Sequence, residues 1–151
     1  MQTLFVSLAG MLLGKKRGVL SVLTYIGIGL LGLPIFTQGG GPSYVLQPSF
    51  GFLIGFVIYT WFTAQMTERI ITPSIKNLLS AQLPGLFFMY AVALPYFYLI
   101  SNFYLDSGMG VDVLMTVCFL WMMPGEALKC LLAAWLGKRL IPVMRRKNAA
   151  P

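Results

Sequence analysis

Long apolar stretches with almost no charged residues make up most of this sequence, and they restrict the possible fold more than any other feature. A helix needs about 20 predominantly apolar residues to cross the hydrocarbon core of a bilayer. Such stretches lie at residues 2–14, 18–36, 51–67, 78–104 and 113–137. Only 10% of the chain is charged, against about 25% in a typical soluble domain. We therefore expect an all-α, polytopic membrane bundle of about five transmembrane segments, forming a single domain over residues 1–151.

The first apolar stretch is shorter than the others. Its length, residues 2–14, corresponds to a helix of about 20 Å, which is too short to cross a bilayer. A secretory signal peptide would carry basic residues before its apolar part, whereas here they follow it. We therefore expect residues 2–14 to be the end of a longer span, with its beginning, or a whole preceding helix, absent from this chain.

Basic residues lie on every second connection between the apolar stretches. They occur at residues 15–17, at Arg69 and Lys76, and within 138–147, whereas the connections 37–50 and 105–112 contain no Lys or Arg. Basic connections face the cytoplasm in membrane proteins, so we expect a cytoplasmic C-terminus. The basic residues behind the net charge of +7 are accounted for as signals of this topology. Nucleic acid is not expected as a partner, because its recognition needs a basic stripe with exposed aromatic residues.

Several kinds of active site are disfavoured by the residue types present. The sequence has no histidine, the commonest general base and metal ligand. Cys118 and Cys130 both lie in apolar stretches, which indicates neither a disulfide framework nor a metal site. No Walker motif is found, so the chain is not expected to hydrolyse ATP alone. We expect no metal and no cofactor.

Glu126 and Lys129 are the ionisable pair within the last apolar stretch. Ionisable groups inside a membrane span are costly and are usually functional. Pro124 and Gly125 interrupt the stretch, so Glu126 is predicted in the first turn of a helix, where an acid is favoured. Their i, i+3 spacing places both side chains on one face. They either form a structural ion pair or bind a polar solute, and the solute site is favoured because a pair buried only for stability seldom repays its desolvation.

The connection from Leu33 to Phe50 is uncharged and rich in Gly and Pro. Three consecutive glycines at 39–41 permit backbone geometries closed to other residues, so this segment is able to fold down over a cavity. Its larger polar groups are Tyr44 and Gln47. A lid or pocket wall is one interpretation, and a passive connector or a loop on the bilayer surface is the other. On the fourth stretch, Tyr90 lies deep enough to need a partner for its hydroxyl, and it faces either a ligand or the core.

These same residues resemble a known family. Residues 32–56, GLPIFTQGGGPSYVLQPSFGFLIGF, are similar to the signature loop and following helix of the BioY family, the biotin-specific S components of energy-coupling factor (ECF) transporters. The similarity continues through residues 89–99, MYAVALPYFYL, and residues 124–140, PGEALKCLLAAWLGKRL. The family pattern in the last segment is Pro-Gly-Asp followed by Leu and Lys, so Glu126 stands where Asp is usual. By this resemblance the chain holds five helices of a six-helix fold.

The resemblance implies a substrate-binding subunit in a prokaryotic plasma membrane that captures biotin from outside. ATP-driven uptake would come from a transmembrane coupling subunit and separate ATP-binding subunits. The binding residues implied are Tyr44, Gln47, Ser49, Tyr90, Glu126 and Lys129. Two alternatives remain at this point. One is a membrane enzyme with Glu126 as acid or base, which lacks a supporting nucleophile or histidine, and the other is a non-transporting structural membrane subunit.

Overall fold

The structure of the protein is a computed structural model that describes residues 2–37, 39–106, 108, 110–114, 116 and 120–149. Its described part consists of helices and the connections between them, with one isolated bridge between Phe36 and Gly39. In chain order the elements are α1 (Gln2–Leu30), η1 (Pro42–Leu46), α2 (Phe50–Glu68), α3 (Ile75–Leu99), η2 (Ile100–Tyr104), α4 (Val111–Leu114) and α5 (Met123–Ala149). The expected all-α fold is confirmed.

Helix α1 is a hairpin of two arms rather than one straight rod. Its backbone leaves the helical region at Gly14, with φ 75° and ψ −178°. The Nε2 of Gln2 donates a hydrogen bond of 2.8 Å to the hydroxyl of Tyr25, although 23 residues of straight helix would separate them by about 35 Å. We call residues 2–13 the first arm and residues 15–30 the second arm. The two predicted stretches therefore meet near Gly14, but the second ends as a helix at Leu30 and not at residue 36.

Gly14 adopts a conformation that is essentially restricted to glycine. A Cβ at this position would also lie 3.0 Å from Oε1 of Glu68. We expect Gly14→Ala to lower the stability of the folded protein by about 1–3 kcal/mol. Thermal unfolding in detergent measures this. Gly27→Ala is the control, because its Cβ meets nothing within 4 Å and Ala is the better helix former by about 1 kcal/mol. Equal melting temperatures for the two variants would contradict the hairpin geometry.

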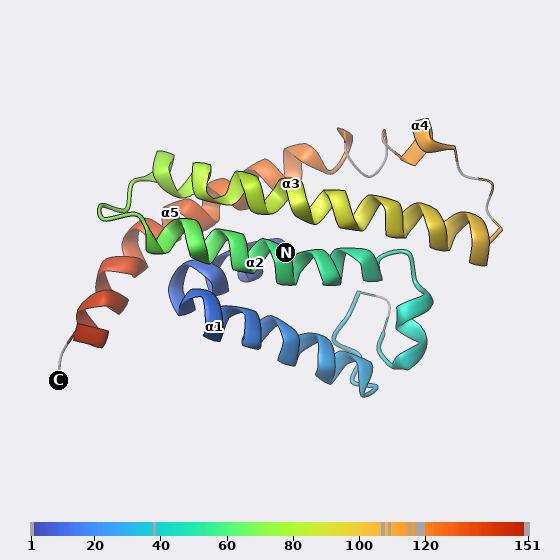
Figure 1. Cartoon of the computed structure of the whole chain (residues 1–151), viewed down its shortest axis with the longest axis horizontal. Helices are drawn as coiled ribbons and strands as arrows, with labels where there is room; N and C mark the ends of the chain where they lie inside the picture. The colour runs from blue at the N-terminus through green and yellow to red at the C-terminus, as the bar shows by residue number, and fades with distance from the viewer. Residues whose placement is uncertain are drawn as a thin grey trace.

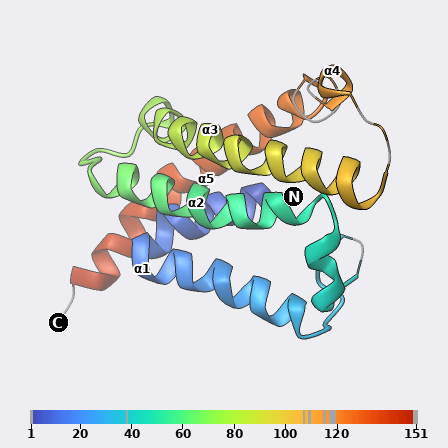
Figure 2. The ribbon, with the colours of Figure 1, turned by 45° about the vertical axis from the view of Figure 1, so that its right-hand side comes forward.

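Helices α2 and α3 form the centre of the bundle. They lie side by side, with the second arm of α1 on the far side of α2 (Figures 1 and 2). Residues 50–68 and 75–104 are the described helical segments long and apolar enough to cross a membrane by length and composition. The two helices approach closely at small residues: a Cβ on Gly55 would lie 2.7 Å from Cγ of Met89, and one on Gly85 would lie 2.7 Å from the Tyr59 ring.

The basic connections gather at one end of the bundle. Nζ of Lys15 lies 3.4 Å from Oε2 of Glu68 at the end of α2, and the short α2–α3 connection follows directly. Met11, Leu78, Ala134 and Ile141 form one buried cluster that joins α1, α3 and α5 near this end. The connection from α1 to α2 lies at the opposite end of the bundle (Figure 1). The alternation of basic and uncharged connections therefore corresponds to two ends of the fold.

The last predicted stretch, residues 113–137, differs from the helix that forms. Helix α5 begins at Met123, so Pro124 and Gly125 lie in its first turn, and it continues to Ala149 beyond the apolar sequence. Pro is accommodated there because the first-turn N–H groups have no intrahelical partner. The interruption is thus a helix start, as the sequence indicates. Cys118 lies outside the described residues, as do residues 115, 117 and 119.

Candidate functional site

The ion pair of Glu126 and Lys129 lies at the start of α5. Nζ of Lys129 is 2.6 Å from Oε1 of Glu126, and the side chains are 24% and 6% exposed. Helix formation from Met123 onward places the two residues one turn apart on the same face, as their spacing predicts. The carboxylate is therefore removed from solvent almost completely, while the ammonium group reaches the edge of the bundle.

The first arm of α1 supplies a third polar group to this pair. The hydroxyl of Thr3 donates a hydrogen bond of 3.1 Å to the same Oε1 of Glu126, and Thr3 is itself buried. Both partners of Glu126 therefore use one oxygen. The other oxygen, Oε2, is buried and has no hydrogen-bond partner among the described residues. A buried carboxylate oxygen without a partner is costly, and it can accept a hydrogen bond from a ligand donor.

A cavity of about 950 Å³ lies between α3 and α5, and Glu126 forms part of its wall. This volume is within the usual range for small-molecule sites. The lining is mainly apolar, with Leu86 and Leu94 from α3 and Leu131 from α5, and its polar members include Gln82, Tyr90 and Glu126. Phe87, at the rim, is 70% exposed. Two of the predicted site residues, Tyr90 and Glu126, are thus brought together in one cavity.

The loop before α2 holds the other predicted site residues. The hydroxyl of Tyr44 lies 3.2 Å from Oγ of Ser49 and 3.4 Å from Oγ1 of Thr37. Its ring packs against Phe36, with centroids 4.4 Å apart, and both rings are buried. Gln47 is half-buried and its backbone N–H donates to the carbonyl of Tyr44 at 3.0 Å. The loop is therefore packed into the bundle by its aromatic residues rather than lying apart from it.

The six predicted site residues are not all brought together in one place. Tyr90 and Glu126 line the cavity between α3 and α5, whereas Lys129, Tyr44, Gln47 and Ser49 are not among the residues that line it. Tyr90 and Tyr44 belong to the same buried apolar cluster. Phe52, at the start of α2, contacts Tyr90 edge to face, with ring centroids 5.9 Å apart. Tyr90 therefore belongs both to the cavity wall and to the apolar cluster that contains Tyr44.

Sequence reasoning missed Thr3 and Gln82. Gln82 lines the cavity and is fully buried, and its hydrogen bonds reach three other helices. The available signal was a large amide within an apolar stretch, where an unpaired polar group is disfavoured. For Thr3 the signal was its four-residue spacing from Ser7, which places two polar groups on one helix face.

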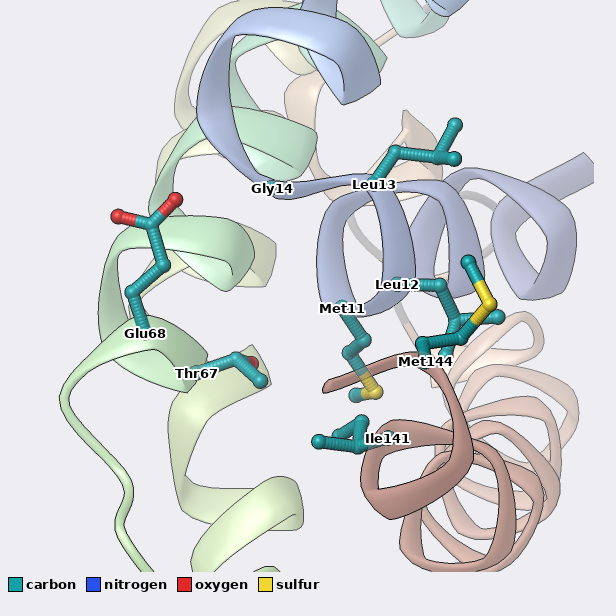
Figure 3. A pocket seen from close by; sticks show the side chains of 8 residues that line it. All are labelled: Met11, Leu12, Leu13, Gly14, Thr67, Glu68, Ile141 and Met144. Atoms are coloured by element: carbon teal, nitrogen blue, oxygen red, sulfur yellow. The ribbon is translucent and has the colours of Figure 1, made fainter. Parts of the chain in front are cut away.

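A second pocket lies at the basic end and contains none of the predicted site residues. Its volume is about 180 Å³, and Figure 3 shows its side chains. Glu68 lies on one side of it, and Met11, Ile141 and Met144 form the apolar side. Glu68 is engaged across the turn at Gly14: its Oε1 accepts the backbone N–H of Lys15 at 3.1 Å. We therefore assign this pocket to packing of the hairpin and not to the candidate site.

The long apolar helices of the bundle are those of a membrane protein, and the mainly apolar cavity between α3 and α5 is its candidate small-molecule site. The BioY family model matches residues 1–146, and the chain belongs to the BioY family. It is 42% identical to the "Probable biotin transporter BioY" of Lysinibacillus sphaericus, over 99% of this chain and 76% of that protein. It is 30% identical to the "Biotin transporter BioY" of Thermotoga maritima, over 93% of this chain and 78% of that protein.

A solved structure agrees with these sequence relatives. The chain matches the crystal structure of the S-component for biotin from an ECF-type ABC transporter with a TM-score of 0.78 and 26% sequence identity. The match covers 93% of this chain and 73% of that one. Because the relatives are transporters and a transporter component, the enzyme alternative finds no support in them.

Proposed function

We propose that this protein is the substrate-binding S component of an ECF-type importer and that it binds biotin through Glu126, Lys129, Tyr90 and the loop before α2. The observation that carries this proposal is the buried Oε2 of Glu126, which has no partner among the described residues and belongs to a side chain on the wall of a large cavity. An ion pair built only for stability would use both carboxylate oxygens within the protein, because an unused buried acceptor is costly.

Biotin has chemical groups that suit this set of residues. Its ureido ring donates and accepts hydrogen bonds, its sulfur ring is apolar, and its carboxylate is an anion. Glu126 supplies an acceptor for an N–H donor, and Lys129 supplies a donor or a partner for an anion. Leu86, Leu94 and Leu131 provide apolar surface in the cavity that Glu126 lines. A site with one buried acceptor, one ammonium group and apolar walls therefore favours a small ligand of mixed polarity.

The loop residues complete the proposed site from the end of the buried apolar cluster that contains Tyr44. The hydroxyls of Tyr44 and Ser49 lie 3.2 Å apart. A polar group of the ligand is able to take the place of one of them as the hydrogen-bond partner of the other. Gln47 is half-buried beside them. The loop then acts as a wall or lid on the side from which biotin arrives, and Tyr90 links it to the cavity that Glu126 lines.

The proposed orientation in the membrane rests on the basic connections, and the proposed partner subunits rest on the nucleotide-binding motifs that the sequence lacks. Basic connections face the cytoplasm in membrane proteins, which supports a prokaryotic plasma-membrane protein with the loop on the outer face and the C-terminus in the cytoplasm. The sequence carries no Walker motif, so energy for uptake comes from separate ATP-binding subunits through a transmembrane coupling subunit. Biotin is the transported ligand and not a cofactor.

Exchanging the two charges tests this function against a purely structural ion pair. In the double variant Glu126→Lys with Lys129→Glu, the pair can still form, but a donor replaces the buried acceptor. We expect the variant to fold and to bind biotin at least about a hundredfold more weakly, or about 2.7 kcal/mol. Calorimetric titration of the purified protein measures this.

The control for the exchange is Glu126→Asp, which keeps an acceptor of the same charge and is expected to retain binding within about tenfold, or 1.4 kcal/mol. A folded exchange variant with unchanged biotin affinity would contradict the proposal and would favour the structural subunit. Release of a chemically altered product from bound biotin would instead favour the enzyme alternative.

A further inference from the structure

Four helical segments meet at the side chain of Gln82, which is fully buried in α3. Its Oε1 accepts hydrogen bonds from Ser7 of the first arm, at 2.8 Å, and from Tyr59 of α2, at 2.9 Å. Its Nε2 donates to the carbonyl of Leu78 within α3 and to the carbonyl of Cys130 in α5, both at 3.1 Å. A primary amide has two donor hydrogens and two acceptor lone pairs, and all four are used.

A second contact joins α2 to α5 at the same level. The hydroxyl of Tyr59 lies 3.8 Å from Sγ of Cys130. Since the Tyr59 hydrogen is directed to Gln82, the thiol hydrogen of Cys130 is the one available to this contact. Both the backbone and the side chain of Cys130 are therefore held by the cluster of Ser7, Tyr59, Gln82 and Cys130, which we call the Gln82 cluster.

The Gln82 cluster lies one helical turn from Glu126 along α5, and Gln82 and Cys130 also line the cavity. The Gln82 amide has no hydrogen-bonding group left for a ligand, because all four are used within the protein. Cys130 follows Glu126 by four residues in α5, and Ser7 follows Thr3 by four residues in the first arm. Residues four apart lie on one face of a helix, about 6 Å apart along its axis. Thr3 bonds to Glu126, and Ser7 reaches Cys130 through Gln82. The first arm and α5 are thus joined by two polar contacts at successive turns.

We infer that Gln82 is a positioning residue for biotin binding: it holds α5 at the depth in the bundle where Glu126 meets Thr3 and forms part of the cavity wall. This inference rests on the proposed function. Leu78, Ala133 and Ala134 are also fully buried around this level, but apolar contacts are non-directional. Hydrogen bonds require a narrow range of distance and angle, so the amide is what fixes the axial position of α5.

The test replaces Gln82 by a residue of similar length without an amide. Gln82→Met keeps the chain length and the apolar character of the interface, but it removes every bond to Ser7, Tyr59 and Cys130. We expect biotin to dissociate faster and to bind about tenfold more weakly to the folded protein. Amide hydrogen exchange over residues 126–130 is expected to be faster than in the unmodified protein, with or without biotin.

Thr63→Val is the matched control. Thr63 is fully buried in α2, and its hydroxyl has no hydrogen-bond partner among the described residues. This variant also removes a buried polar group, so it shows what the loss of a polar group from the core does when no hydrogen bond to α5 is involved. We expect its biotin affinity to remain within twofold and its exchange over residues 126–130 to be unchanged. Ser7→Ala is the milder variant if Gln82→Met does not fold, and about threefold weaker binding is expected from it.

A double-variant cycle separates positioning from general destabilisation. Thr3→Val releases Glu126 directly, so combining it with Gln82→Met should add less than a further twofold to the loss of affinity. Fully additive losses, or unchanged affinity and unchanged exchange in Gln82→Met, would overturn the inference. If the unmodified protein fails to bind biotin while Gln82→Met still accelerates exchange over residues 126–130, the proposed ligand is wrong and the positioning role of Gln82 stands.

Discussion

Lys129→Ala is expected to weaken biotin binding by about tenfold or more, which corresponds to about 1.4 kcal/mol. The ammonium group is the only charged partner that the described residues provide within 4 Å of Glu126. Its removal leaves a carboxylate that is 6% exposed with Thr3 as its remaining hydrogen-bond donor. Breaking a buried pair in this way typically costs about 3–5 kcal/mol of stability. The melting temperature and the biotin affinity should therefore fall together.

Titration of the purified variant with biotin, beside a thermal melt in the same detergent, measures both effects. Lys76→Ala serves as the control, because Lys76 is an exposed residue at the basic end. Its biotin affinity is expected to match that of the unmodified protein. Unchanged affinity in Lys129→Ala would remove Lys129 from the binding site and leave it as a partner of Glu126 alone.

Gly40→Ala is the second substitution for which we expect a large effect. A Cβ at Gly40 would lie 2.1 Å from the carbonyl oxygen of Leu33 and 2.9 Å from that of Gly29. These are backbone atoms, so no side chain can rotate away, and the loop has to move off the end of α1. The loss would include the hydrogen bond from the N–H of Gly41 to the carbonyl of Gly29, at 2.8 Å. Overpacking of this kind costs about 1–3 kcal/mol or more.

The same movement would displace the loop side chains of the proposed site. Tyr44 and Ser49 lie in the same loop as Gly40, so we expect about tenfold weaker biotin binding, or about 1.4 kcal/mol in affinity, in addition to a lower melting temperature. The measurement is again a titration beside a thermal melt, with Gly27→Ala as the substitution that meets no neighbouring atom. Lowered stability with fully retained affinity would indicate that the loop contributes to the fold and not to the site.

Much of the fold is predictable here because its determinants are local. Apolar length and basic connections define the membrane helices, and Gly14 lies where the first two stretches join. The pairing of Glu126 with Lys129 follows from three-residue spacing on a helix, and Pro124 with Gly125 marks where that helix begins. Each of these needs only neighbouring residues and the geometry of one helix.

The contacts that could not be predicted join residues far apart in the chain. Thr3 is 123 residues from Glu126, and Gln82 is 75 residues from Ser7 and 48 from Cys130. The apolar faces of α2 and α3 do not specify which neighbour a single buried amide will meet, because apolar packing tolerates several helix arrangements. The extension of α5 to Ala149 was also missed, since the basic residues after 137 continue the helix beyond the apolar sequence.

Direct titration of the unmodified protein with biotin tests the central claim. The purified chain, in detergent or in lipid nanodiscs, is titrated by calorimetry with biotin and, in a parallel run, with a similar-sized carboxylic acid that lacks the ureido ring. Our account predicts tight, saturable binding of one biotin per chain and at least about a hundredfold weaker binding of the acid, or about 2.7 kcal/mol. Equal affinity for the two ligands, or no saturable heat with biotin, would contradict a site built around the buried acceptor of Glu126.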